Sequence, residues 1–328
     1  MESRFDLPPF GDAESEASQQ SQPSPAPPVL SLQEIAAAVE GDVRADEPMS
    51  RHTSFGIGGP ADCFFRPAGE KDLRWIITWA RAAGKPVQVI GNGTNLLVSD
   101  NGVHGVVIQL GPGFRQVTAA GDVLIAGAGT KLAALIQSAE QAGLSGLEAL
   151  VGVPGTLGGA IVTNAGTDVG SISDVVQAVS VMEETGHIFT MHHDDLQYAY
   201  RHSSLMNSGL VVLQVRLVLQ PADRTQIRAK IERLRIKRAT RQPLRARSAG
   251  SVFKNPATIA AGKVLDRAGA KGMRCGDAQV SYKHANFIVN RGQATAAQVR
   301  TLVEQLEDLV WRLHGIRLEP EIEFVGEW

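Results

Sequence analysis

Three glycine-rich segments, each beside an apolar strand pattern, constrain the fold of this chain most. They read VIGNGTNLLV, GAGTKLAAL and VGVPGTLGGAIVTNAG. Glycine lets the backbone approach an anion closely, and the N–H groups and Thr or Asn side chains of such a loop can hold phosphate oxygens. One loop of this kind usually forms only a tight turn. Three of them in one chain favour a large phosphate-bearing cofactor.

None of these segments has the spacing of a common phosphate-binding motif. The G-x-G-x-x-G pattern that opens a βαβ unit and the G-x-x-x-x-G-K-[ST] pattern of a P-loop are both missing from them. A standard Rossmann site or P-loop is therefore not expected. The residues expected to contact the cofactor are Gly91, Asn92, Gly93, Thr94, Asn95, Gly127, Gly129, Val153, Pro154, Gly155, Thr156, Gly158 and Asn164.

Hydrophobic patterns predict helices and strands in mixed order along the chain. Apolar residues at helical spacing predict helices, and short apolar runs between turn residues predict strands. The mixture indicates an α+β or α/β class. Helices are expected over 31–41, 70–84, 130–143 and 299–313, strands over 85–91, 102–110, 122–129, 209–220, 283–290 and 317–326, and a hairpin over 175–192 that turns at Thr185 and Gly186.

The composition narrows the functional class. Apolar residues make up 43% and charged residues 20%, as in globular proteins, and a net charge of −2 argues against a general nucleic-acid binder. Cys63 and Cys275 lack metal-ligand spacing, so neither a disulfide framework nor a zinc site is expected. No apolar run is long enough to cross a bilayer, and the first residues lack the apolar core of a signal peptide. These features favour a cytoplasmic protein without membrane insertion.

Two stretches differ in composition from the rest of the chain. Residues 1–29 are rich in Ser, Pro and Gln and are expected to form a disordered tail. From Arg228 to Arg247 there are nine Lys or Arg residues and one acid, Glu232. Apolar residues at helical spacing continue through the first part of this run. It is therefore expected to be a linker helix that leads into a C-terminal domain.

Seven motifs follow one another in a distinctive order: RHTSFGIGGPADCFFRP, VIGNGTNLLVSD, GLEALVGVPGTLGGAIVTNAG, YRHSS, GSVFKNP, VSYKHANFIVN and LEPEIEFVG. From about Leu32 to Gly326 the chain thereby resembles the UDP-N-acetylenolpyruvoylglucosamine reductases. These flavoenzymes make UDP-N-acetylmuramate for bacterial peptidoglycan. The glycine-rich motifs would also suit the broader group of vanillyl-alcohol-oxidase-type FAD domains, whereas the C-terminal motifs single out the reductases.

The resemblance implies an α+β fold with a two-part FAD-binding domain of the vanillyl-alcohol-oxidase type and a C-terminal α+β substrate domain. It implies non-covalently bound FAD, NADPH as the hydride donor and UDP-N-acetylglucosamine enolpyruvate as the substrate. A strand soon follows YRHSS, as in the branch of the family that lacks an extra substrate-covering loop. The chain is expected to act as a monomer. The expected FAD-binding parts are 30–115 and 116–221, and the expected substrate domain is 222–328.

Three residues match the catalytic positions of the family. Reduction of an enolpyruvyl ether builds negative charge beside a carboxylate, so it needs cations or shared protons there and a proton donor for the carbon. The resemblance implies that Arg201 supplies a fixed charge and a planar fork. It implies a protonated or proton-sharing Glu321 and proton delivery from the hydroxyl of Ser251. The surrounding sequence AGSVF is not the G-x-S-x-G pattern of a hydrolase nucleophile.

Residues of the same types lie close to two of these positions. Glu319 and Glu323 would share a face with Glu321 if this stretch is a strand, so only the motif selects Glu321. Ser248 lies similarly close to Ser251. Spacing alone cannot separate the catalytic residue from its neighbour in either case.

The remaining polar motifs have weaker assignments. Asn255 is expected to contact the nucleotide portion of the substrate, and Lys254 its diphosphate, although the basic run before it is more often a solvated helix face. His284 and Asn286 match the family without an assigned role. Adjacent residues such as HHDD, at 192–195, rarely converge on one ion, so no metal site is expected.

Two other functions remain open from the sequence. A flavin-dependent oxidase of an alcohol or lactone would consume oxygen rapidly and would not need NADPH. A non-catalytic nucleotide-binding module would be colourless or would show no turnover. A yellow protein that oxidises NADPH only when the enolpyruvyl substrate is supplied would separate the three.

Overall fold

The computed structural model describes residues 32–328, which form two compact units that are each discontinuous in sequence. The expected tail at 1–29 lies outside the described residues. The division into domains at residues 115 and 221 stays a prediction. The first unit comprises residues 32–44, 65–91 and 108–234, and the second comprises 45–64, 92–107 and 235–328.

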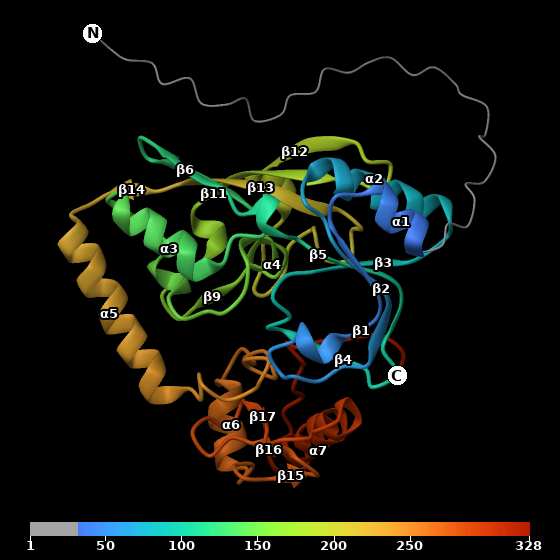
Figure 1. Cartoon of the computed structure of the whole chain (residues 1–328). Helices are drawn as coiled ribbons and strands as arrows, with labels where there is room; N and C mark the ends of the chain where they lie inside the picture. The colour runs from blue at the N-terminus through green and yellow to red at the C-terminus, as the bar shows by residue number, and fades with distance from the viewer. Residues whose placement is uncertain (1–31) are drawn as a thin grey trace. The chain divides into compact units, whose positions relative to one another are not determined.

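The centre of the first unit is an antiparallel sheet of five strands in the order β12-β11-β13-β7-β6. Helices α3 (Leu132–Gln141) and α4 (Leu157–Val162) lie along one face of this sheet (Figure 1). The expected hairpin is confirmed, since Met182 pairs with Ile188 across a turn in which Gly186 has a φ of +81°. The strands are β6 (Val117–Ala120), β7 (Val123–Gly127), β11 (Val176–Met182), β12 (Ile188–His192) and β13 (Val211–Val218).

Two helices and several short strands complete the first unit. The expected apolar stripe of α2 is buried, and the helix ends before Gly84, whose φ of +63° suits glycine. The elements are α1 (Leu32–Ala38), α2 (Glu70–Ala82), β3 (Val87–Ile90), β8 (Leu144–Ser145), β9 (Gly166–Thr167), β10 (Gly170–Ser171) and β14 (Gln220–Pro221).

Four elements contain the points at which the chain passes from one unit to the other. They are β1 (Asp42–Pro48), β2 (Pro60–Arg66), β5 (Val103–Gln109) and α5 (Arg224–Arg241). The three strands belong to a sheet of order β1-β2-β5-β3. Helix α5 confirms the helix expected in the basic run, and its buried residues are Ile227 and Leu234.

The second unit packs two helices against a small antiparallel sheet. Helix α7 begins after Thr295, whose hydroxyl accepts a hydrogen bond from the N–H of Gln298, and its apolar face packs on β15, β16 and α6. Strands β4 and β18 pair in parallel. The elements are β4 (Leu96–Val98), α6 (Ala261–Arg267), β15 (Arg274–Cys275), β16 (Ala278–Val280), β17 (Ile288–Asn290), α7 (Ala296–His314) and β18 (Glu323–Val325).

Two strands are shorter than the sequence predicts. The expected strand over 283–290 is reduced to β17, and the one over 317–326 is reduced to β18. In the second case Pro320 has no N–H to give to a ladder and forms only an isolated bridge with Phe253. Glu321 therefore precedes the strand, so the condition under which Glu319, Glu321 and Glu323 would share one strand face is not met.

Short 3₁₀ turns connect many of these elements. They are η1 (Met49–Arg51), η2 (Pro112–Phe114), η3 (Glu148–Leu150), η4 (Ile172–Asp174) and η5 (His193–Leu196).

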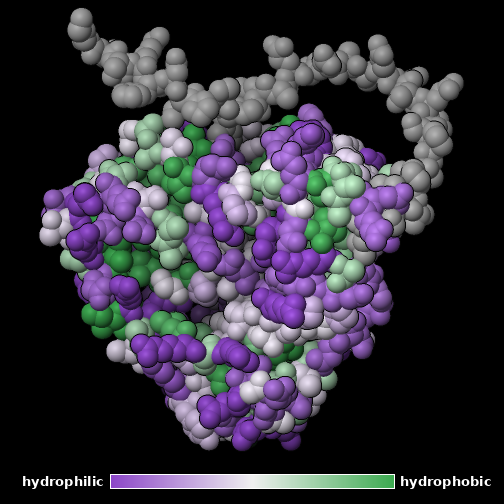
Figure 2. All heavy atoms as spheres, viewed as in Figure 1, coloured by the Kyte–Doolittle hydropathy of each residue, from purple (hydrophilic) through white to green (hydrophobic). Residues whose placement is uncertain are grey.

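The face drawn in Figure 2 alternates hydrophilic and apolar side chains rather than showing one continuous apolar patch. Within residues 32–328, no helix combines the length and the apolar character that a bilayer crossing requires.

Candidate active site

In the first unit, the first and third glycine-rich loops touch. A Cβ atom added to Gly91 would lie 2.4 Å from Oγ1 of Thr156, which no real side chain can do. The carbonyl of Gly91 accepts a hydrogen bond of 2.8 Å from Nε2 of Gln109. Glycine is therefore required at position 91 because two loops distant in sequence approach each other there.

The second and third loops of the first unit are joined by backbone hydrogen bonds. The N–H of Leu157 donates to the carbonyl of Thr130, and the N–H of Gly158 donates to the carbonyl of Ala128, each over 2.8 Å. A Cβ on Gly127 would lie 2.2 Å from the carbonyl oxygen of Phe114. The structure thus brings together these expected cofactor contacts of the first unit: Gly91, Gly127, Gly129, Gly155, Thr156 and Gly158.

The remainder of the first loop belongs to the second unit. Residues 92–95 bend sharply without a hydrogen-bonded turn, and Gly93 has a φ of +58°. The carbonyl of Gly93 accepts from the N–H of Ser54 over 3.0 Å, while Oγ of Ser54 donates to the carbonyl of Ser248 over 2.7 Å. The RHTSF segment therefore holds the glycine loop and the segment before Ser251 together.

These loops fit a phosphate-bearing cofactor. The left-handed conformation of Gly93 is the type that turns neighbouring N–H groups toward one side and creates an anion-binding concavity. Glycines at the contacts allow a close approach of the backbone. Asn and Thr side chains supply neutral donors. In the first unit, Gly91 and Thr156 would hold the cofactor through these groups, and in the second unit Asn92, Gly93, Thr94 and Asn95 are expected to do so.

Arg201 lies in a tight turn of the first unit. Ala199 and His202 exchange backbone hydrogen bonds of 3.0 and 3.1 Å, so Tyr200 and Arg201 form the tip of the turn. Arg201 has a φ of +54°, a conformation that residues other than glycine adopt rarely. Its guanidinium lies 5.2 Å from the ring centre of Tyr200. Such strain is concentrated at functional sites, where the surrounding structure maintains it.

Asn164 supports this turn. Its side chain is 7% exposed, and Nδ2 donates to the carbonyl of Ala199 over 2.8 Å. The guanidinium of Arg201 donates to the carbonyl of Gly166 over 3.0 Å. Asn164 was expected from the sequence to contact the cofactor. The structure adds a different contact, to the turn that presents Arg201.

Ser251 and Glu321 come from neighbouring backbone positions of the second unit. The N–H of Glu321 donates to the carbonyl of Val252 over 2.7 Å. Nδ2 of Asn95 donates to the carbonyl of Glu321 over 2.9 Å, and the N–H of Glu323 donates to the carbonyl of Asn95 over 2.8 Å. One loop that is expected to bind the cofactor is thus tied directly to Glu321.

Asn286 fixes the segment that follows Ser251. Its Oδ1 accepts from the N–H of Phe253 over 2.9 Å, and its Nδ2 donates to the carbonyl of Phe253 over 2.8 Å. Its own carbonyl accepts from the N–H of Val252 over 2.9 Å. Asn286 is 3% exposed. Asn286 thus supplies the hydrogen bonds that a neighbouring strand would otherwise give to Val252 and Phe253. The sequence motif alone did not indicate this role.

Lys254 and Asn255 have local partners in this structure. The N–H of Lys254 donates to the carbonyl of Glu319 over 2.8 Å, and its ammonium pairs with the Glu319 carboxylate. Oδ1 of Asn255 accepts from the N–H of Ala261 at the start of α6 over 3.0 Å. Glu319 is therefore an ion-pair partner of Lys254. Roles of Lys254 and Asn255 toward the substrate stay predictions.

His284 is half-buried and braces Asn286. Its Nδ1 accepts a hydrogen bond of 3.2 Å from the N–H of Asn286, and a Cβ on Gly262 would lie 2.7 Å from its Cε1. Burial, with a smaller contribution from the charge of Lys271, lowers the pKa of His284. The surroundings of the imidazole therefore favour its neutral form.

The HHDD segment forms part of a short turn. The side chain of Asp195 accepts from the N–H of His192 over 2.8 Å. Across residues 32–328, no group of three or more His, Cys, Asp or Glu side chains could hold a metal ion.

Sequence reasoning missed Asp100, whose carboxylate accepts from the N–H groups of Ala296 and Ala297 at the start of α7. Nothing local in the sequence connects these distant residues.

Comparison with known proteins decides the family. Residues 61–192 match the FAD binding domain, and residues 242–325 match the C-terminal domain of UDP-N-acetylenolpyruvoylglucosamine reductase. The reductase of Moorella thermoacetica is 46% identical over 294 residues, covering 90% of this chain and 97% of that protein. The chain belongs to the UDP-N-acetylenolpyruvoylglucosamine reductase family.

Other members of the reductase family agree with this assignment. The reductase of Agathobacter rectalis is 43% identical over 86% of this chain and 94% of its own length. The crystal structure of the Thermus caldophilus reductase has a TM-score of 0.77 and 38% identity, and covers 87% of this chain and 100% of that one. The α+β class, with an FAD-binding domain and a reductase C-terminal domain, is confirmed.

Proposed function

We propose that this member of the reductase family reduces UDP-N-acetylglucosamine enolpyruvate to UDP-N-acetylmuramate, with FAD bound non-covalently and NADPH as the hydride donor. The observation that supports it most is the junction in the second unit. There the segment carrying Ser251, the residue Glu321 and the glycine loop at Asn95 are joined by hydrogen bonds of 2.7 to 2.9 Å. A monomeric state and a cytoplasmic location stay predictions.

FAD held at these loops would supply hydride chemistry, with NADPH as the reductant and the enolpyruvyl group as the acceptor. The protein holds the phosphates of the cofactor at the glycine loops. It also keeps the GNGTN loop at a fixed distance from Glu321, because the side chain of Asn95 donates a hydrogen bond to the carbonyl of Glu321. FAD is held there without a covalent link in this proposal.

In this proposal, Ser251 gives the proton that completes the reaction. It follows Gly250, which has a φ of +78° and no atom within 4 Å of the position a Cβ would take. An alcohol is a weak acid, but an enolate carbon is basic enough to take its proton. Asn286 forms hydrogen bonds with the backbone of Val252 and Phe253, the two residues after Ser251. The backbone of Ser251 therefore has little freedom to move away.

Arg201 and Glu321 serve the substrate carboxylate in this proposal. The planar guanidinium of Arg201 suits a carboxylate, and its strained backbone is consistent with selection for position over stability. Glu321 holds or shares a proton as charge develops on the carboxylate during the hydride addition. Lys254 and Asn255 contact the nucleotide diphosphate portion of the substrate.

The test uses purified protein without oxygen. The protein should be yellow, NADPH should bleach its flavin absorbance, and the enolpyruvyl substrate should restore that absorbance with one equivalent of UDP-N-acetylmuramate formed. Failure of NADPH to reduce the flavin would contradict the proposal. Rapid reoxidation by air with an alcohol or lactone as the reductant would favour an oxidase instead.

A further inference from the structure

Residues 321–328, here named the 321–328 segment, run beside the stretch that follows the GNGTN loop. After the contacts of Asn95, β18 pairs in parallel with β4 from Glu323 with Leu96 to Val325 with Val98. The N–H of Ser99 then donates to the carbonyl of Val325 over 2.9 Å. The contacts therefore continue in register away from Glu321.

Beyond β18, the 321–328 segment stays close to residues 99–102. Gly326 has a φ of +95°, and a Cβ there would lie 2.0 Å from the carbonyl oxygen of Gly102. The carbonyl of Glu327 accepts from Oγ of Ser99 and, over 3.4 Å, from Nδ2 of Asn101. The N–H of Glu327 donates to the carbonyl of Gly102 over 3.3 Å. Hydrogen bonds thus hold both the backbone N–H and the backbone carbonyl of Glu327.

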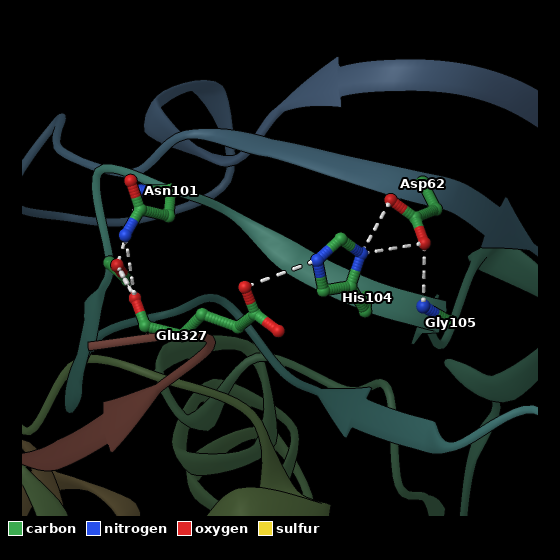
Figure 3. Close-up of polar contacts among 6 residues, drawn as sticks. Asp62, Asn101, His104, Gly105 and Glu327 are labelled. Atoms are coloured by element: carbon green, nitrogen blue, oxygen red, sulfur yellow. Dashed lines mark hydrogen bonds and ion pairs between the residues drawn. The ribbon is translucent and has the colours of Figure 1, made fainter.

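The outer end of this ladder is a cluster of one imidazole and two carboxylates. Nδ1 of His104, on β5, lies 3.1 Å from Oδ2 of Asp62 on β2, and Nε2 lies 3.3 Å from Oε2 of Glu327 (Figure 3). Oδ2 of Asp62 also accepts from the N–H of Gly105 over 3.0 Å, which fixes the carboxylate. A neutral imidazole has one N–H, whereas the imidazolium has two. Two facing carboxylates therefore match the protonated ring.

We propose that His104 fastens the 321–328 segment to β2 and β5 and thereby acts as a positioning residue for Glu321. The positioning part rests on the proposed function, because it needs Glu321 to act on the substrate. The fastening part does not. The pairing of β18 with β4 links the two parts, since displacement of Glu327 would loosen the short ladder that begins at Glu323, two residues after Glu321.

The charge state of His104 makes the fastening sensitive to pH. The hydrogen bond to Asp62, followed by the charges of Glu327 and Asp62, raises the pKa of His104. These carboxylates come from β2 and from the 321–328 segment, the elements packed against the ring. A raised pKa means that the contact is complete below the ordinary histidine pKa of about 6.5 and weakens as the pH rises through the folded value.

The decisive experiment follows backbone amide hydrogen exchange in the peptide that covers 321–328, corrected for the intrinsic pH dependence. In the parent holoenzyme, protection should fall about two- to fivefold from pH ~6 to ~9, as expected for an exposed charge pair. His104→Arg, charged throughout, should show no such fall. His104→Gln and Glu327→Gln should show low protection at both pH values. His314→Gln, at the exposed C-terminal end of α7, should behave like the parent. A flat parent profile, or protection in His104→Gln equal to the parent's, would overturn the fastening.

The positioning claim has its own readout. The rate of flavin reoxidation by substrate should lose its pH dependence in His104→Arg and should drop in His104→Gln, while flavin reduction by NADPH stays unchanged in both. Unchanged reoxidation despite altered protection would overturn positioning and leave the fastening established. An enzyme that never accepts the enolpyruvyl substrate would refute the proposed function and with it positioning, whereas the exchange data would still decide the fastening.

Discussion

The backbone N–H of Glu321 donates to the carbonyl oxygen of Val252 over 2.7 Å. Because Val252 follows Ser251 directly, this bond places the proposed proton donor and the proposed acid on adjoining backbone. Neither residue is buried in the core of the second unit. The two positions should therefore respond to substitution mainly through chemistry rather than through stability.

Ser251→Ala should slow product formation about 10²- to 10⁴-fold, the usual range for loss of a general acid. Reoxidation of the flavin by substrate should fall less, because hydride addition precedes carbon protonation. Stopped-flow absorbance and chemical-quench product analysis would measure the two rates. Ser248→Ala is the matched control, because Ser248 accepts the bond from Ser54 through its backbone carbonyl, which the substitution keeps. A Ser251→Ala enzyme as active as the parent would exclude the proton-donor role.

Arg201→Gly should be more stable than Arg201→Ala by about 1 kcal/mol, because the φ of +54° disfavours a Cβ and suits glycine. Both variants should lose substrate reduction by about 10²- to 10³-fold, as expected when one group stabilising a developing charge is removed. Urea unfolding and steady-state turnover would test these effects separately. Equal stability of the two variants would show that the turn relaxes when the guanidinium is absent.

Gly91→Ala should weaken FAD retention and destabilise the protein by about 1–3 kcal/mol, because the new methyl group would overlap Oγ1 of Thr156. Combining it with Thr156→Ala removes the overlap and should recover part of the stability, although not the FAD contact proposed for Thr156. Gly69→Ala is the control, since no atom lies within 4 Å of its added Cβ. Flavin fluorescence after dialysis, together with thermal unfolding, would measure both effects. If the changes in the free energy of unfolding caused by the two substitutions add exactly, a direct clash between the side chains is contradicted.

Acid should destabilise the protein through His284. The unfolded histidine takes up a proton near pH ~6.5. Burial lowers the pKa of His284 in the folded state, so the unfolded state binds more protons below that pH. Stability should therefore fall as the pH drops from ~7 to ~5. His284→Gln should reduce this fall, and His314→Gln should not. Comparing urea midpoints at the two pH values tests the assignment, and an identical acid response in His284→Gln would refute it.

Local patterns in the sequence predict much of this fold. The α2 stripe, the hairpin at Gly186 and the apolar strand β13 each depend on neighbours a few residues away, so periodicity and turn chemistry indicate them correctly. The glycine motifs likewise indicated close backbone approaches. Their contact partners, such as Thr156 for Gly91, are known only from the structure.

The errors occur where side chains or distant segments replace regular pairing. KHANFIVN resembles one strand, but the buried amide of Asn286 bonds the backbone of Phe253 instead. LEPEIEF alternates like a strand, but Pro320 removes a donor and Glu321 bonds to Val252. These competing bonds join segments far apart in the chain, and no window of sequence around either motif contains both partners.

The pairing of β4 with β18 has a consequence for how the protein is made. Residues 96–98 leave the ribosome long before residues 323–325, and at 5–20 residues per second the wait is roughly 11 to 45 s. Throughout that time the nascent GNGTN loop lacks the strand and the glutamate that anchor it. The anchored form of this loop can therefore arise only after residues 323–325 have been made.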